Sequence, residues 1–147
     1  MLFSSQTIKK ILIPTDGSDY SIRAAEYGIS IAKVHQAQIN VVYVLDEVVI
    51  EKFSKMTERE NVERDLKNDG QRYVNYILAL AQKEGVAATF LIVKGRPFEQ
   101  IVHLANGLNM DLIVMGTYGR RGAERILLGS VAERVIEYAH CPVLVVK

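Results

Sequence analysis

The sequence predicts an α/β protein, a single doubly wound, five-stranded parallel sheet in one domain over residues 1–147. Two observations predict this fold. Five short runs of β-branched and other apolar residues alternate with longer segments whose apolar residues recur every three or four positions, the spacing of a buried helix face. Strands that alternate with helices pair in parallel, because a right-handed crossover is almost the only way to connect them.

The first strand and the first helix are separated by a turn rich in capping residues. Ile11–Ile13 form the strand, Pro14 ends it, and Asp16–Ser18 supply turn and cap chemistry. Ile39–Leu45 form a second strand, which is almost wholly apolar and therefore suits coverage on both faces. The buried face of the helix between them is marked by Ile22, Ala25, Ile29 and Ala32.

The middle of the sequence holds a mixed segment, a long helix and a third strand. Asp46–Thr57 mixes apolar and charged residues; we expect a loop partly packed as a helical turn, with a lid or a partner surface as the alternative. A charged helix begins at Glu58, and Gly85 lies where a left-handed C-cap belongs. Thr89–Val93 form the third strand. The buried stripe of the long helix comprises Val62, Leu66, Tyr73, Ile77 and Leu80.

The last third of the chain supplies two helices and two strands. Pro97 opens a helix at its first position, where a missing N–H is tolerated, and Gly107 closes it. Leu112–Met115 form the fourth strand, Ser130–Ala139 the last helix, and Val143–Val146 the fifth strand. We expect all five apolar runs to be buried core.

Composition excludes several classes of function. The 147 residues are 49% hydrophobic and 24% charged, as in a globular domain rather than a disordered chain. Lys and Arg number 18 against 17 Asp and Glu, so no bulk charge draws nucleic acid or an anionic membrane. The single cysteine, Cys141, forms no internal disulfide and has no adjacent base, so we expect a small buried residue rather than a nucleophile.

The distribution of apolar residues bears on the expected location of the protein. Met1–Lys10 contain no apolar signal-peptide core, and no apolar run approaches the roughly 20 residues of a membrane span. We therefore expect a soluble, cytoplasmic protein without nucleic-acid or membrane partners.

The stretch after the fourth strand has the composition of an anion site, and open parallel sheets bind ligands beyond the carboxyl ends of their strands. Gly116 follows the strand directly, and glycine lets backbone N–H groups approach an anion closely or adopt positive φ. Ser130 and Glu133 fit the S-x-x-E capping box, so the helix after Gly129 is expected to present free N–H groups to phosphate. The residues alone leave two readings open, a phosphate site or a glycine-rich loop and capped helix without a ligand.

The same stretch resembles the nucleotide signature of a known family. Gly116-x-x-Gly119, nine further residues and then Gly129-Ser130 match G-x2-G-x9-G-[ST], and so the sequence is similar to the ATP-binding branch of the universal stress proteins. The resemblance covers essentially the whole chain. The other matching blocks are Ile11–Ser18, Val41–Val44, Gly95–Pro97, Asp111–Gly116 and Cys141–Val146.

The resemblance implies a Rossmann-like sheet of the adenine nucleotide α-hydrolase-like type, with strand order 3-2-1-4-5 and ATP at its carboxyl edge. Asp16 would lie by the adenosine, and Val44 would offer backbone groups to adenine. Mg²⁺ would be held through the phosphates rather than by protein ligands. The remaining implied contacts are Pro14 and Thr15 on the adenosine wall, Met115 and Gly116 by the ribose and phosphates, and Gly119, Arg120, Gly129, Ser130 and Val131 around the triphosphate.

Each of these side chains also has a role that needs no nucleotide. Asp16 could instead cap the first helix together with Ser18, although we favour the nucleotide contact, and arginines in exposed loops, such as Arg120 and Arg121, are commonplace. We expect a bulky residue in place of Gly116 to abolish nucleotide binding and to leave the fold intact, because it would block backbone approach rather than packing.

The resemblance implies an ATP-binding stress-response or signalling module, read by an unknown protein partner, with at most slow hydrolysis. The alternative within the family is a dimeric scaffold without nucleotide. An adenylyl-transferring enzyme is a third possibility, but it needs a phosphate loop where this sequence has Thr15–Asp19. The last strand, Val143–Val146, would be an exposed apolar edge in a monomer, so we expect a homodimer paired through it.

Overall fold

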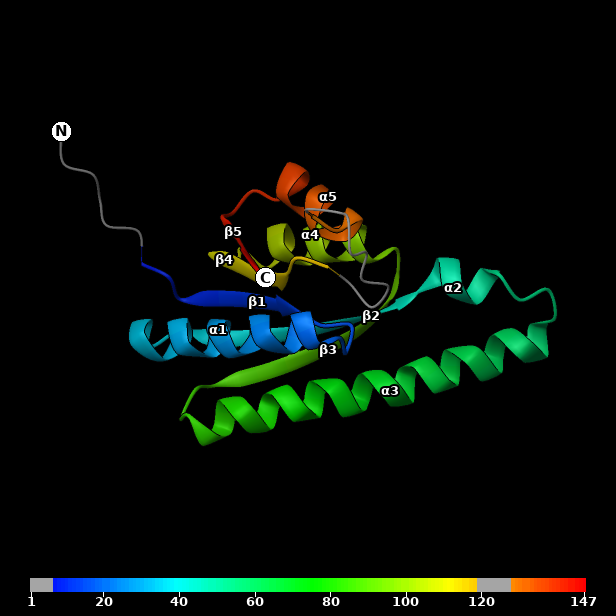
Figure 1. Ribbon diagram of the computed structural model, residues 1–147, viewed down its shortest axis with the longest axis horizontal. Coiled ribbons are helices and arrows are strands. Elements are labelled where there is room, and N and C mark those ends of the chain that lie inside the picture. The colour runs from blue at the N-terminus through cyan, green and yellow to red at the C-terminus, as the bar shows by residue number, and fades with distance from the viewer. Residues whose placement is uncertain (1–6, 119–127) are drawn as a thin grey trace.

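One five-stranded sheet organises the protein (Figure 1). The computed structural model describes residues 7–118 and 128–147. Every neighbouring pair of strands is parallel, and the order is β3-β2-β1-β4-β5, which confirms the predicted fold class and strand order. The strands are β1 (Lys10–Pro14), β2 (Gln38–Asp46), β3 (Ala88–Gly95), β4 (Leu112–Gly116) and β5 (Val143–Val146).

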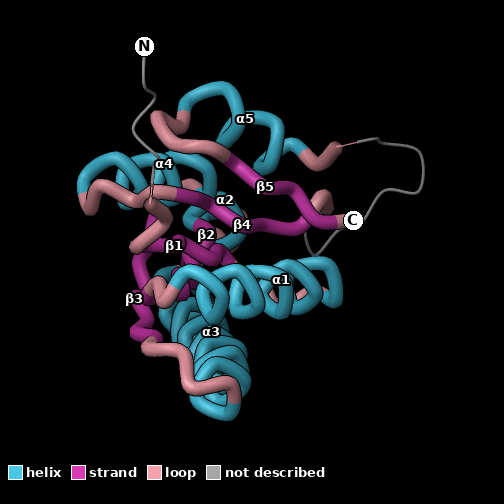
Figure 2. Tube along the Cα trace, turned by 90° about the vertical axis from the view of Figure 1, so that its left-hand side faces the viewer, coloured by secondary structure: helices cyan, strands magenta, loops and turns pink. Residues whose placement is uncertain are grey.

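Helices cover both faces of this sheet, as Figure 2 shows. Because strand side chains alternate between faces, Ile11 and Ile13 pack with α1 and α3, whereas Leu12 packs with α4 and α5. No helix of the described residues is long and apolar enough to cross a lipid bilayer. The helices are α1 (Asp19–His35), α2 (Glu47–Glu51), α3 (Met56–Lys83), α4 (Pro97–Gly107) and α5 (Ser130–Tyr138).

The two edge strands are less buried than the sequence predicts. Phe90 of β3 is 39% exposed and Leu144 of β5 is 37% exposed, whereas Ile11–Ile13 of the central β1 are fully buried. The expectation that all five apolar runs are buried core is therefore wrong for the edges, whereas the expectation that Val143–Val146 forms an exposed edge of the single chain is confirmed. An edge strand has a neighbour on one side only, so the flanking helices cover it incompletely.

Helix boundaries follow the predictions in one case and depart from them in two. Gly85 has φ +71°, as a left-handed residue after α3 requires. Gly107, in contrast, is the last residue of α4, and the left-handed residue that follows is Asn109, with φ 52°. The Asp46–Thr57 segment contains the short helix α2, capped by the Asp46 carboxylate, and α3 begins at Met56 rather than at Glu58.

Close packing of α3 on β2 generates a first prediction. A β-carbon at Gly70 would overlap the ring of the buried Tyr43, whereas nothing lies within 4 Å of the corresponding position at Gly107. We expect Gly70→Ala to lower the free energy of unfolding by about 1–3 kcal/mol, since overpacking outweighs the gain in helix propensity. Gly107→Ala, the matched control, should raise it by up to about 1 kcal/mol. Urea denaturation measures both, and equal stability of the two variants would contradict this packing.

Candidate functional site

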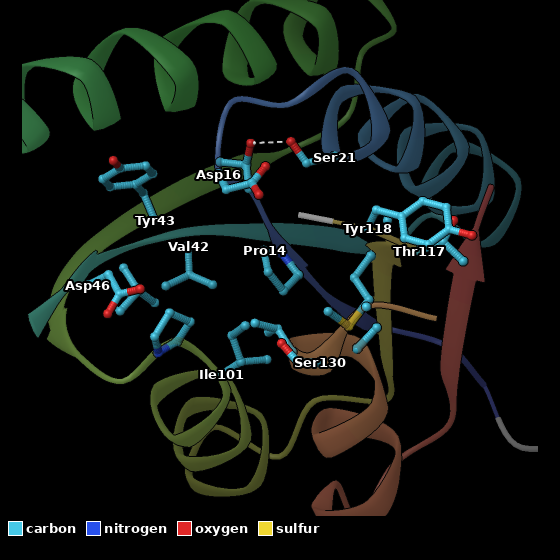
Figure 3. Close-up of a pocket in the computed structure, with 18 of the residues that line it drawn as sticks. Pro14, Asp16, Ser21, Val42, Tyr43, Asp46, Ile101, Thr117, Tyr118 and Ser130 are labelled. Carbon is cyan, nitrogen blue, oxygen red and sulfur yellow. Dashed lines mark hydrogen bonds between the residues drawn. The ribbon is translucent and has the colours of Figure 1, made fainter. Parts of the chain in front are cut away.

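A cavity of about 370 Å³ opens at the carboxyl ends of β1, β2 and β4 (Figure 3). Its volume lies within the range of small-molecule sites, and most of its lining side chains are apolar. Helix α5 contributes residues of its first turn, α4 contributes Pro97 and Ile101, and α3 contributes Leu66. The lining residues are Pro14, Thr15, Asp16, Ser21, Val42, Tyr43, Val44, Asp46, Val49, Leu66, Pro97, Ile101, Met115, Gly116, Thr117, Tyr118, Gly129, Ser130, Val131 and Ala132.

The turn after β1 is fixed by a series of local hydrogen bonds. Ser21 donates its hydroxyl proton to the carbonyl oxygen of Ser18, so the Thr15 hydroxyl must donate in the 3.0 Å bond that joins the two side chains. The Thr15 oxygen also accepts from the N–H of Gly17, and the Asp16 carboxylate accepts from the N–H of Ser18. The hydroxyl of Thr15 therefore shapes the turn, and the turn holds the Asp16 side chain at the cavity wall.

The same turn leaves part of the β2 backbone facing the cavity. The N–H of Thr15 donates to the carbonyl of Val42, so Val42 points its main-chain groups toward β1. Two residues on, Val44 points the same way, because main-chain groups alternate sides along a strand. The N–H of Gly17 does not continue the ladder to Val44, since it binds the Thr15 hydroxyl. The main chain of Val44 thus faces the space that β1 has vacated.

Gly116 has a structural role that the sequence does not reveal. A β-carbon there would lie 2.9 Å from the carbonyl carbon and from Cβ of Tyr20, in the first turn of α1. A bulky residue would therefore push α1 away from β4, and the expectation that such a substitution leaves the fold intact is wrong. Positive φ is not needed at Gly116 or at Gly129, where φ is −66°; the described glycines with positive φ are Gly17, Gly85 and Gly95.

The first turn of α5 differs from the predicted capping box. Gly129 is the N-cap, no side chain caps the helix, and Ser130 is its first residue. The N–H of Glu133 binds the carbonyl of Gly129, so the Ser130 side chain has no part in the cap. Ser130 is exposed, and Figure 3 shows its side chain at the cavity. The first N–H groups of an α-helix have no partner within the helix, so this turn offers donors beside a hydroxyl.

Nine of the eleven binding residues expected from the sequence line this one cavity, although they come from four separate segments of the chain. Gly119 and Arg120 lie outside the described residues, as does Arg121. The nine are Pro14, Thr15, Asp16, Val44, Met115, Gly116, Gly129, Ser130 and Val131.

Other lining residues escaped the sequence analysis. Asp46 and Thr117 directly follow a strand core, so their position at a carboxyl end was a usable signal. Leu66 and Ile101 belong to helix faces whose periodicity predicts only burial, and nothing in the sequence separates a residue beside a cavity from one in the core.

The charge of the cavity is negative among the described residues. Asp16 and Asp46 are the charged side chains of the described lining, which contains no Lys or Arg. No group of three or more His, Cys, Asp or Glu side chains suited to a metal ion occurs in residues 7–118 or 128–147. Cys141 packs outside the cavity, and burial raises the pKa of its thiol, which favours the unreactive protonated form.

Comparison with known proteins places the chain in a family. A sequence profile described as "Universal stress protein family" matches residues 7–147. Universal stress protein MJ0531 of Methanocaldococcus jannaschii is 47% identical over 139 residues, which cover 95% of this chain and 82% of the relative.

Solved structures show the same fold. The structure of MJ0577, studied as a hypothetical protein of the same organism, superposes with a TM-score of 0.87 at 31% identity and covers 97% of each chain. A universal stress protein in complex with cAMP has a TM-score of 0.74 at 23% identity, covering 97% and 99% of the two chains. One from Archaeoglobus fulgidus in complex with dAMP has a TM-score of 0.68 at 22% identity, covering 97% and 100%. The chain described here belongs to the universal stress protein family.

Proposed function

We propose that the protein is an ATP-binding stress-response and signalling module of the cytoplasm, with at most slow hydrolysis, whose nucleotide occupies the cavity at the carboxyl edge of the sheet. The observation that carries the proposal is that one cavity has apolar walls and also contains the uncapped first turn of α5. An adenine nucleotide matches both features, because it has a flat base at one end, which suits the apolar walls, and anionic phosphates at the other, which suit the helix N-terminus. The stress-response role is taken from the family.

The adenosine end of the ligand fits the wall formed by β1 and β2. Val44 directs its main-chain N–H and carbonyl into the space beyond β1, where they match the acceptor and donor of an adenine edge. Asp16, on the neighbouring turn, suits the ribose hydroxyls or the exocyclic amine, which are donors. Pro14, Ile101 and Met115 supply apolar surface for the ring.

The phosphate end fits the first turn of α5. Backbone N–H groups of Ser130 and Val131 lie at the positive end of the helix dipole, and the Ser130 hydroxyl adds a further donor. The described lining carries carboxylates and no cation, so we propose Mg²⁺ bound through the phosphates as the neutralising charge. Gly119 and Arg120 complete the proposed phosphate contacts.

The solved complexes support an adenine ligand without fixing its phosphates. The partners named for the two more distant family structures, cAMP and dAMP, share the adenine base and differ in their phosphate groups. ATP is the proposed ligand of this chain because the backbone N–H groups of the first turn of α5, which no described side chain caps, are donors for several phosphate oxygens.

Calorimetric titration of the purified protein tests the proposal directly. We expect one ATP per chain in the presence of Mg²⁺, and at least roughly tenfold weaker binding with EDTA, because the triphosphate then meets Asp16 and Asp46 without a counter-ion. Adenosine, which carries no phosphate, should bind equally with and without EDTA. An absence of heat at protein concentrations in the tens of micromolar, with nucleotide-free protein, would remove the proposed function.

Variants at Ser130 separate the contributions of its hydroxyl and its amide. Ser130→Ala removes the hydroxyl alone, and we expect roughly threefold to tenfold weaker ATP binding. Ser130→Pro also removes the N–H, and should weaken binding further. Proline is tolerated at the first position of a helix, and the extended ψ of 154° at Gly129 suits a following proline. Circular dichroism checks that α5 persists, and equal ATP affinity of wild type and Ser130→Pro would argue against phosphate at this turn.

We propose in addition that the chain forms a homodimer through β5. Val143–Val146 lies at the edge of the sheet, and Leu144 is 37% exposed on it. An apolar edge strand with one open side is a template for pairing, and a second copy satisfies it.

Light scattering after size exclusion measures this assembly. Wild type should elute with twice the chain mass of 16.5 kDa, and Leu144→Lys should elute as a monomer, because a buried lysine opposes pairing. Val34→Lys, at an 80% exposed position of α1, is the matched control and should stay dimeric. A wild-type monomer would refute the dimer and leave the nucleotide proposal standing.

A further inference from the structure

We infer that Thr117 is a positioning residue for the nucleotide site, which holds the end of β4 and the start of α5 in one fixed relation. The inference rests on the proposed ATP binding, and it adds a residue that the nucleotide signature leaves unspecified. Thr117 lines the cavity and is 3% exposed. It follows Gly116 at the end of β4 and precedes Gly129, the N-cap of α5, by twelve residues of chain.

Three hydrogen bonds meet at Thr117. Its N–H and its Oγ1 hydroxyl both donate to the carbonyl oxygen of Val146, each at 2.9 Å. Its own carbonyl accepts from the N–H of Gly129 at 2.6 Å. Thr117 therefore joins the ends of β4 and β5 to the first turn of α5, three elements that are separate along the chain.

The hydroxyl is what distinguishes this junction from ordinary strand pairing. The N–H bond to Val146 alone would continue the β4–β5 ladder and leave the side chain of Thr117 without an anchor. The second bond, from the side chain, fixes the rotamer and anchors the Cα of Thr117 at two points against the end of β5. The Thr117 carbonyl then points at Gly129, and the N–H groups of Ser130 and Val131 are held in place relative to the cavity.

A purely structural role predicts a different result from a positioning role. Thr117 bonds to Gly129, beside the proposed phosphates, while Asp16 lies in the turn after β1 and Val44 in β2. Loss of the hydroxyl should therefore weaken the binding of ATP and leave the binding of adenosine unaffected. General destabilisation of the sheet would weaken the binding of both ligands. Thr117→Val removes only the hydroxyl and keeps the branched shape, and Thr117→Ser restores the hydroxyl.

The experiment compares ATP and adenosine affinities, each with Mg²⁺, across these variants. We expect Thr117→Val to raise the Kd of ATP roughly threefold to tenfold, as for one lost hydrogen bond, and to leave the Kd of adenosine within about twofold. Thr117→Ser should return the ATP value to within about twofold of wild type. Thr89→Val, on the edge strand β3, is the matched control and should change neither. An equal rise for both ligands, or no change for ATP, would overturn the inference.

Amide hydrogen exchange tests the same role without nucleotide. In ligand-free protein we expect faster exchange of the Gly129 N–H in Thr117→Val than in wild type or Thr117→Ser. The N–H of Ile113, which binds the carbonyl of Pro142, reports on the sheet and should be unchanged. If wild type binds no ATP, the proposed function fails, and the exchange result alone decides whether Thr117 holds Gly129. Unaltered exchange at Gly129 would refute it.

Discussion

The site depends on the parallel pairing of β1 with strands on both sides. β2 and β4 flank β1, and their carboxyl ends meet at one edge of the sheet. After β1 the chain passes to α1 on one face, and after β4 it passes to α5 on the other. Helices α1 and α5 thus lie on opposite faces of the sheet, so neither helix fills the edge between them. The cavity at this point follows from the strand order, before any side chain is considered.

Local chemistry then divides this cavity into two ends. On the β1 side, the hydroxyl of Thr15 captures the N–H of Gly17 and ends the ladder, so the main chain of Val44 is left facing the opening. On the β4 side, a glycine N-cap leaves the donors of α5 uncovered. At both ends, backbone hydrogen-bonding groups next to a turn have no partner within the described sheet or helix, and they are therefore able to bind a ligand.

The sequence predicts what depends on local spacing and fails where distant segments meet. β-branched runs and glycine at position 85 determine strands and a helix end, and the structure confirms them. The contact between Gly116 and Tyr20 joins residues about a hundred positions apart, so no local pattern reveals it. The S-x-x-E pattern at Ser130 was misleading, because the chain enters α5 one residue earlier than a serine cap requires. Exposure of Leu144 follows from the strand order, which the family resemblance implied and apolar character alone does not give.

A crystal structure of the protein with Mg-ATP is the most direct measurement of the central claim. The account predicts adenine at hydrogen-bond distance from the main chain of Val44, with phosphate oxygens on the amides of Ser130 and Val131. Two results would contradict it. One is nucleotide bound instead in the groove between α4 and α5, which is lined by residues such as Phe98 and Arg134. The other is a cavity at the carboxyl edge that is filled by protein side chains in crystals grown with saturating ATP.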